Sequence, residues 1–299
     1  MGVKISPADA LALLRANGHD VDALEPLTGG MWSTTFAFNE KGREYVVRFH
    51  ERRDDLEKDR FAARWSSPRL RTVRMTEIGD VGTGAYGISE RIRGAEIDGL
   101  DAEGMRRILP QLFDTLEATR DADLGGTSGW GLWHGDGNAA DATWAEALMR
   151  NTGDDRRRPV ARSRVGADGF DAGVRRMREL LPFAPERRHL VHNDLLYHNV
   201  FVDDRGIVLL DWGASIYGDF LYDAALLTFW WPWYAQWSSV DIVTEVTRRF
   251  GTTRHFAERL RLCELDIGVS HIAFQLAHRD VDSARWTSRR TAERANAPL

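Results

Sequence analysis

Two polar residues whose side chains could take part in catalysis, Asp194 and Asn199, lie five positions apart in the stretch HLVHNDLLYHNVFV (189–202). A second acid, Asp211, follows 17 residues after the first, at the end of IVLLD. Transfer of a phosphoryl group needs a carboxylate at the acceptor hydroxyl and oxygen ligands for one or two Mg²⁺ ions. These residue types therefore predict that Asp194 and Asn199 are catalytic, and that Asn199 and Asp211 hold the metal.

The segment between these residues predicts how they come together. VFVDDRGIVLL has two apolar runs separated by the turn sequence DDRG (203–206), a pattern typical of a β-hairpin. A hairpin of this length returns the chain to its start, so Asn199 and Asp211 are expected side by side. Each polar residue alone is more typical of a turn or a helix cap, but the joint pattern favours catalysis. His192 is expected to hydrogen-bond the loop backbone rather than to transfer a proton.

The first ninety residues predict a small α+β lobe. Apolar and polar residues alternate between turn signals such as NEKG (39–42), which indicates antiparallel strands. A helix is expected to begin near Asp54 and Asp55, acids suited to its N-terminal end, and to stop before Pro68. The expected strands are 23–29, 32–38, 43–50, 72–79 and 85–92.

The remainder of the chain is predicted to be mainly helical. Apolar residues recur at helical spacing over 101–123, despite Pro110. The passage 125–144 is too rich in Gly and Trp for one element, and the charge run 151–169 is expected to be a solvated loop. Further helices are expected at 170–181, 220–236, 239–250, 255–279 and 281–295.

Composition excludes several classes of protein. The chain has 299 residues, and 40 basic against 45 acidic residues give a net charge of −5, which disfavours a nucleic-acid partner. Its single cysteine, Cys263, excludes an internal disulfide and fits a reducing cytoplasm. The longest apolar run, 224–237, is too short to span a bilayer and contains Pro232. A cytoplasmic protein with no membrane partner is therefore expected.

The segment from His189 to Ala225 resembles a known family. It is similar to the His-x-Asp-x-x-x-x-Asn loop, the metal-binding Asp and the Gly-Asp-x-x-x-Asp segment of the aminoglycoside phosphotransferases, which are small-molecule kinases with a protein-kinase-like fold. Four further segments resemble members that act on hygromycin B: TFWWPW (228–233), TSGWG (127–131), KDR (58–60) and ISERIRG (88–94). The resemblance implies a two-lobe α+β fold, with a nucleotide-binding lobe over 1–92 and a helical lobe with the catalytic loop and acceptor site over 93–299.

The resemblance also implies roles for residues of the small lobe. Arg48 takes the place of the lysine that usually grips the α- and β-phosphates, and its guanidinium keeps the charge. Its partner is Glu57 or Asp59, and the KDR match favours Asp59. The linker 89–94 is expected to bind adenine, but its side chains do not indicate whether ATP or GTP is the preferred nucleotide. The remaining cofactor-binding candidates are Gly29, Gly30 and Ser33 in the phosphate-covering loop, and Glu90 and Ile92 in the linker.

Recognition of a polycationic sugar needs carboxylates for ammonium groups and aromatic faces for sugar rings. Alternatives remain open, because a Trp-rich helix is often core. Asp219 fits an acceptor site, a helix cap or a brace of the catalytic loop equally. The acceptor-site candidates are Asp136, Asp219, Asp223, Trp230, Trp233, Glu264 and Asp266.

These features together predict a monomeric aminoglycoside O-phosphotransferase that confers antibiotic resistance. It is expected to transfer the γ-phosphate of ATP, with Mg²⁺, to a hydroxyl of an aminocyclitol such as hygromycin B. One alternative is a kinase of the same fold for a sugar, choline or homoserine. The other is a catalytically silent nucleotide-binding protein, which the presence of Asp194, Asn199 and Asp211 argues against.

Overall fold

The structure is a computed structural model that describes residues 3–27, 32–152, 165 and 168–299. It divides into two compact units. Unit 1 comprises Met1–Gly99, His134–Asn138 and Leu196–Ala214, and unit 2 comprises Leu100–Trp133, Ala139–Leu195 and Ser215–Leu299. The predicted lobe boundary after residue 92 remains a prediction. Gly29, Gly30 and most of the 151–169 charge run lie outside the described residues.

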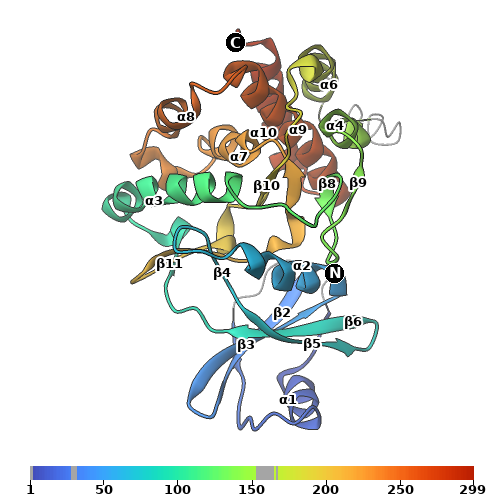
Figure 1. The fold of residues 1–299 in the computed structure, drawn as a ribbon, viewed down its shortest axis with the longest axis vertical. Helices are drawn as coiled ribbons and strands as arrows, with labels where there is room; N and C mark the ends of the chain where they lie inside the picture. Colours follow the sequence, from blue (N-terminus) through green and yellow to red (C-terminus); the bar gives the residue numbers. More distant parts are fainter. Residues whose placement is uncertain (1–2, 28–31, 153–164, 166–167) are drawn as a thin grey trace. The chain divides into compact units, whose positions relative to one another are not determined.

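A five-stranded antiparallel sheet forms the centre of unit 1, as predicted (Figure 1). Its longest pair is a hairpin closed at Lys41 and Gly42, which both have the positive φ angles that a tight hairpin turn requires. The predicted strand at 72–79 divides into a two-residue strand and a longer strand that begins at Met75. In sheet order the strands are β1 (Glu25–Pro26), β2 (Ser33–Glu40), β3 (Arg43–His50), β6 (Gly84–Glu90) and β5 (Met75–Val81).

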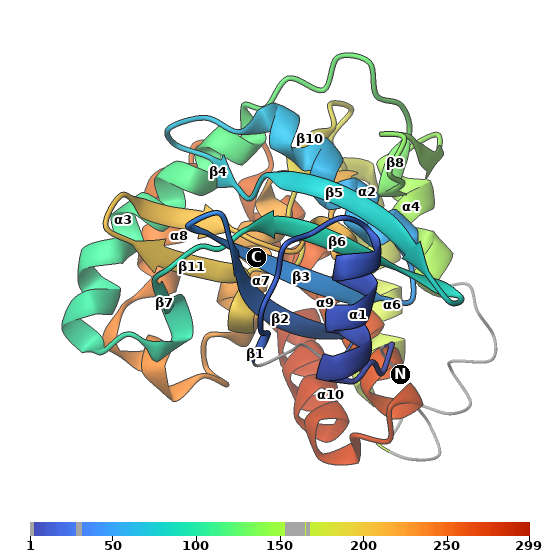
Figure 2. The ribbon, with the colours of Figure 1, turned by 90° about the horizontal axis from the view of Figure 1, so that it is seen from below.

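Two helices lie on opposite faces of this sheet (Figures 1 and 2). Helix α1 (Pro7–Ala16) buries Ala10 and Leu14 against a core that includes Phe36, Val47 and Phe49. Helix α2 (Arg53–Ala62) covers the other face, and the short 3₁₀ helix η1 (Ala63–Trp65) ends it before Pro68, as expected.

A second sheet of unit 1 contains the predicted hairpin. Strands β11 (Val200–Asp203) and β12 (Gly206–Leu209) pair from Val200 with Leu209 to Asp203 with Gly206, which confirms the prediction. Arg71 closes the turn end, because its guanidinium binds both carboxylate oxygens of Asp203 at 2.7 and 2.6 Å. The flanking strands are β4 (Arg71–Thr72) and β7 (Ala95–Glu96).

Unit 2 is mainly helical, as predicted, but it also contains a four-stranded sheet that the sequence does not predict. Its strands, in sheet order, are β10 (His189–Val191), β13 (Ile216–Gly218), β8 (Trp130–Trp133) and β9 (Ala139–Asp141). The helices are α3 (Ala102–Arg120), α4 (Trp144–Thr152), α6 (Asp168–Leu180), α7 (Leu221–Trp230), α8 (Ile242–Phe250), α9 (Phe256–Ala277) and α10 (Val281–Asn296).

Helix α7 is fully buried within unit 2. All ten of its residues are buried, and it packs against α9, which in turn lies along α10 (Figure 1). It ends at Trp230 rather than at 236, because Pro232 cannot continue a helix. No helix within the described ranges is long and apolar enough to cross a membrane.

Candidate active site

Arg48 of β3 is the centre of the polar cluster in unit 1. Its guanidinium donates to the carboxylate of Asp59 on α2 and lies 3.2 Å from Asp211 Oδ2. Glu57 instead pairs with Arg53 and Arg60 on its own helix. The partner that the sequence leaves open is therefore Asp59.

Asp59 also holds the backbone that follows Asp211. Its Oδ1 accepts the N–H of Trp212 at 2.7 Å, while its Oδ2 accepts from Arg48. Burial raises the pKa of Asp59 to about 6, and the adjacent Arg48 guanidinium opposes this rise. One side chain of α2 thus links the third strand of the sheet to the chain after the hairpin.

The open end of the hairpin brings Asn199 and Asp211 together, as predicted. Asn199 ends a 3₁₀ turn, and its carbonyl accepts the N–H of Leu210 at 2.8 Å, which continues the ladder to the residue before Asp211. Asp211 has a φ of 56°, a conformation that is uncommon for a non-glycine residue. Its side chain is 44% exposed, so the carboxylate remains accessible to a ligand.

This donor set fits Mg²⁺. An amide oxygen and a carboxylate oxygen are the hard ligands that Mg²⁺ prefers, and Mg²⁺ usually keeps several waters and needs only one or two protein carboxylates. Among the described residues no group of three or more His, Cys, Asp and Glu side chains forms a denser metal site. We therefore regard Asn199 and Asp211 as candidate ligands, and their role belongs to the proposal below.

In unit 2, the loop before Asp194 is held by Asp223. The two oxygens of this buried carboxylate accept the N–H groups of His192 and Asn193 at 2.9 and 2.8 Å. Burial raises the pKa of Asp223 to about 6, while the two backbone N–H groups lower it. Asn193 has a φ of 64°, so these bonds fix a turn that the chain would rarely adopt alone.

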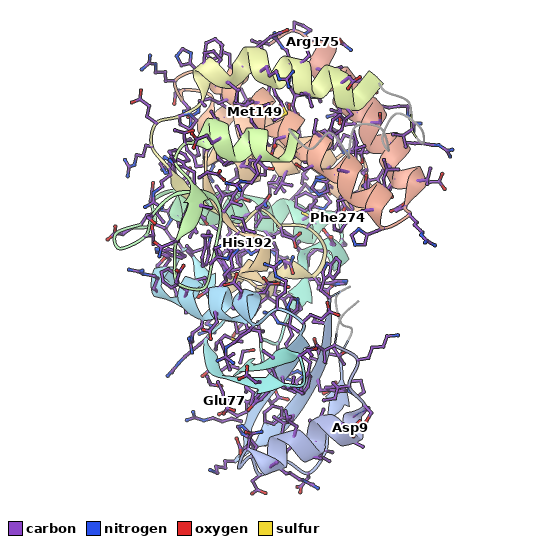
Figure 3. All side chains as sticks on the ribbon, turned by 90° about the vertical axis from the view of Figure 1, so that its right-hand side faces the viewer. Asp9, Glu77, Met149, Arg175, His192 and Phe274 are labelled. Atoms are coloured by element: carbon purple, nitrogen blue, oxygen red, sulfur yellow. The ribbon has the colours of Figure 1, made fainter. Side chains whose placement is uncertain are left out.

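His192, which is labelled in Figure 3, is fully buried in unit 2. Its Nδ1 accepts the N–H of Asp194 at 3.3 Å, so the ring binds the loop backbone as predicted. The side chain of Asp194 itself is half-buried.

Asp219 is buried and ion-paired, which suits neither an acceptor site nor a brace of the catalytic loop. It is 1% exposed and forms a bidentate ion pair with Arg259 of α9 at 2.8 and 2.6 Å. Its Oδ1 also accepts the N–H of Leu221 at the start of α7, which is the helix-cap alternative. The bracing contacts belong to Asp223, four residues later, and both carboxylates are occupied inside the unit.

The two acids of α9 are also buried and bonded within the helix packing. Glu264 accepts from Thr228 Oγ1 at 2.8 Å and from Arg294 Nε at 2.8 Å. Asp266 accepts from the hydroxyl of Tyr222 at 2.7 Å. Since Glu264 and Asp266 are only 1% and 4% exposed, an ammonium group of a ligand cannot reach them, and we omit both acids from the acceptor site proposed below.

The Trp-rich segment divides between core and surface. Trp230 is 6% exposed and stacks on Trp286 of α10 with ring centroids 5.3 Å apart. Trp233 is 41% exposed and meets the edge of Trp286 at 5.0 Å. Only Trp233 of the two predicted acceptor-site tryptophans therefore offers a face to a ligand, and its role remains a proposal.

The other candidates lie in unit 1. Asp136 belongs to a loop anchored on α2, where Asp54 accepts from the Gly135 N–H at 2.8 Å and binds His134 at 3.0 Å. The first residue of β2 is Ser33, and the last residue of β6 is Glu90, which is exposed. Ile92 follows two residues later and is half-buried. The roles of these four candidates in binding a ligand remain proposals.

Burial of Asp266 predicts a pH-dependent stability that one substitution should remove. Burial raises the pKa of this carboxyl from 3.8 to about 7, so the folded protein holds a proton that the unfolded chain releases. Its contribution to stability is therefore present below about pH 4 and is lost as the pH rises through about 7. The melting temperature of Asp266→Asn should therefore rise relative to that of the wild type as the pH increases from 4 to 8. If thermal unfolding gave the same difference in melting temperature between the two proteins from pH 4 to pH 8, the raised pKa of Asp266 would be contradicted.

The sheet of unit 1, the arginine–aspartate link to α2 and the braced loop before Asp194 are features of a protein-kinase-like phosphotransferase. A family model described as "Phosphotransferase enzyme family" matches residues 23–259, and the chain belongs to this family. The predicted family, fold class and enzyme class are confirmed.

Two kinds of relative refine this placement. The chain is 30% identical over 281 residues to hygromycin-B 4-O-kinase of Escherichia coli, which covers 90% of this chain and 80% of that protein. The crystal structure of aminoglycoside phosphotransferase APH(4)-Ia matches with a TM-score of 0.83 and 28% identity over 97% of this chain and 100% of that chain. A thermostable mutant of the same enzyme, in ternary complex with AMP-PNP and hygromycin B, gives a TM-score of 0.82 and 29% identity over 95% and 97% of the two chains.

Proposed function

We propose that this protein is an aminoglycoside O-phosphotransferase that transfers the γ-phosphate of ATP to a hydroxyl of an aminocyclitol antibiotic, with hygromycin B as the first candidate. The observation that carries the proposal is the 30% identity to hygromycin-B 4-O-kinase, which extends over 90% of the chain. The presence of every chemical group that phosphoryl transfer needs supports it. By the same proposal, the enzyme confers resistance to its substrate and acts in the cytoplasm.

Each candidate residue has a role in this reaction. The Asp194 carboxylate orients the acceptor hydroxyl and accepts its proton as the oxygen attacks the γ-phosphorus, and the bond from that phosphorus to the β–γ bridging oxygen breaks to release ADP. Asn199 and Asp211 hold Mg²⁺, which when bound neutralises charge on the nucleotide phosphates. Arg48 supplies a fixed positive charge, because its pKa is raised above its already high value by Asp59 and Asp211. The enzyme thus mostly positions the reactants and balances charge.

Recognition of the acceptor rests on fewer residues than the sequence predicts. Trp233 offers an exposed aromatic face, and Asp136 offers a carboxylate in an exposed loop position. We retain these two as candidates for binding a sugar ring and an ammonium group. Ser33, Glu90 and Ile92, with Gly29 and Gly30 outside the described residues, remain proposed nucleotide contacts.

An acceptor panel tests the substrate assignment. Purified protein with Mg²⁺ and either ATP or GTP would be assayed with hygromycin B, kanamycin, streptomycin, choline and homoserine. Hygromycin B should give a kcat/KM at least about tenfold above every other acceptor, since an acceptor that satisfies the polar groups of a site is preferred by 1.4 kcal/mol or more. Preference for choline or homoserine would establish the alternative kinase. Nucleotide binding without any transfer would establish the silent protein.

A further inference from the structure

Helix α2 buries an unusual number of charged groups. Asp55, Lys58 and Asp59 recur at the spacing of one helix face, and they are 8%, 0% and 9% exposed. Charged side chains are almost never fully buried unless they are paired. Because a helix needs only apolar residues to cover a sheet, this face indicates a task beyond packing.

Two consecutive residues of that face bind the backbone of the two residues that follow Asp211. The carboxylate of Asp59 accepts the N–H of Trp212 at 2.7 Å, and the Nζ of Lys58 donates to the carbonyl of Gly213 at 2.8 Å. Both contacts lie within unit 1. Burial lowers the pKa of Lys58 to about 7, and its Nζ carries N–H donors in both the charged and the neutral form.

The backbone that these contacts hold is not relaxed. Asp211 has a φ of 56°, and its own Oδ1 accepts the N–H of Gly213 at 3.3 Å. A Cβ at Gly213 would lie 3.1 Å from Asp211 Oδ1 and 3.2 Å from Asp55 Cγ, so the turn packs closely against α2. A left-handed non-glycine residue persists only where its surroundings over-determine it. Lys58 and Asp59 supply that restraint.

We propose that Lys58 is a positioning residue for phosphate transfer: its bond to the Gly213 carbonyl holds the turn that aims the Asp211 carboxylate at the metal. The proposal rests on the metal-binding role of Asp211 in the proposed function. Asp59 restrains the same turn but also pairs with Arg48, so substituting Lys58 removes one restraint of the turn and keeps the Arg48–Asp59 pair. Residues that orient a metal ligand typically contribute about 10- to 100-fold to metal affinity.

The informative substitution is Lys58→Met. Methionine keeps the length and apolar stem of the side chain and removes the donor, and because the Gly213 carbonyl and the carboxylates around Lys58 lose this partner, the free energy of unfolding should fall. Lys58→Gln, whose amide is too short to reach the Gly213 carbonyl, serves as the second variant if Lys58→Met does not fold. Arg71→Met is the matched control, because it loosens the opposite, turn end of the same hairpin.

Binding of Mn²⁺ to the protein with saturating ADP, measured by electron paramagnetic resonance, gives a readout independent of turnover. Lys58→Met should raise the Kd for Mn²⁺ about tenfold or more. Its Kd for ADP in the presence of EDTA should stay within about threefold of the wild type, since the metal-free interaction does not use Asp211 as a ligand. Arg71→Met should lower the melting temperature and leave the Kd for Mn²⁺ unchanged.

The possible failures are distinguishable. An unchanged Kd for Mn²⁺ in Lys58→Met, or an equal rise in Arg71→Met, would overturn the positioning role while the metal site stands. Failure of the wild-type protein itself to bind Mn²⁺ with ADP would overturn the proposed metal-binding function, and the role of Lys58 with it.

Discussion

Asp194→Ala is expected to lower the kcat of phosphate transfer about 10²- to 10⁴-fold, the usual contribution of a positioned general base. Nucleotide affinity should change little, because Asp194 is not among the groups proposed to contact the nucleotide or its metal. The loop should keep its shape as well, since Asp223 holds it through the backbone of His192 and Asn193. Steady-state kinetics with the acceptor, together with calorimetric titration of ADP, separates the two effects.

Asp204→Ala is a suitable control for that substitution. Asp204 is an exposed acid in the turn of the β11–β12 hairpin, so its removal changes the net charge equally without touching either candidate ligand. It should retain wild-type kcat. Turnover of Asp194→Ala within about threefold of this control would be too high for loss of a general base and would exclude Asp194 from that role.

Asp223→Ala should be the most damaging substitution outside the reacting groups, because it affects stability and turnover together. It leaves two backbone N–H groups without their acceptor, at a cost of about 1–3 kcal/mol each when the donors stay buried. The free energy of unfolding should therefore fall by about 2–6 kcal/mol. Release of the Asn193 turn should also displace Asp194 and lower kcat in the fraction that remains folded.

A more conservative substitution at the same position gives a graded test of this prediction. Asp223→Asn keeps one carbonyl oxygen, which can accept one of the two N–H groups, so its loss of stability should lie between those of wild type and Asp223→Ala. Urea unfolding and kinetics at a temperature where all three proteins are folded would order them. If Asp223→Ala kept wild-type kcat under those conditions, the carboxylate would have no part in positioning Asp194.

The elements predicted well are those whose signals are local in sequence. The β2–β3 hairpin carries its own alternation and its own turn at Lys41 and Gly42, and the β11–β12 hairpin carries the turn at 203–206. The β11–β12 hairpin is a short-range connection that pairs the backbone of Asn199 with the residue before Asp211. Asn199 and Asp211 therefore come together as expected.

The sheet of unit 2 has no such signal. Its strands have three or four residues, and two of its three pairings join distant segments: Leu190 pairs with Tyr217, and Tyr217 pairs with Gly131. Strands this short carry too few residues for a period-two pattern, and Gly131 interrupts the apolar residues of β8. Pairing at such separation depends on tertiary packing, which local propensity does not encode.

The acceptor site was the least predictable part for a related reason. An acid near an aromatic residue looks the same in sequence whether it faces a ligand or a buried arginine. Asp219 is neutralised by Arg259, which follows 40 positions later, and Glu264 by Arg294. The brace formed by Asp223 depends on backbone groups 30 and 31 residues earlier. The only sequence signal for this bracing role is the position of Asp223 at the end of the Gly-Asp-x-x-x-Asp segment, in the first turn of α7.

The most direct test of the proposed function is the mass of hygromycin B after incubation with the protein, ATP and Mg²⁺. An increase equal to one HPO₃ group, present with wild type and lost with Asp194→Ala, is the predicted result. Unmodified hygromycin B, recovered from wild-type protein shown to bind ATP, would contradict the assignment of this antibiotic as the acceptor.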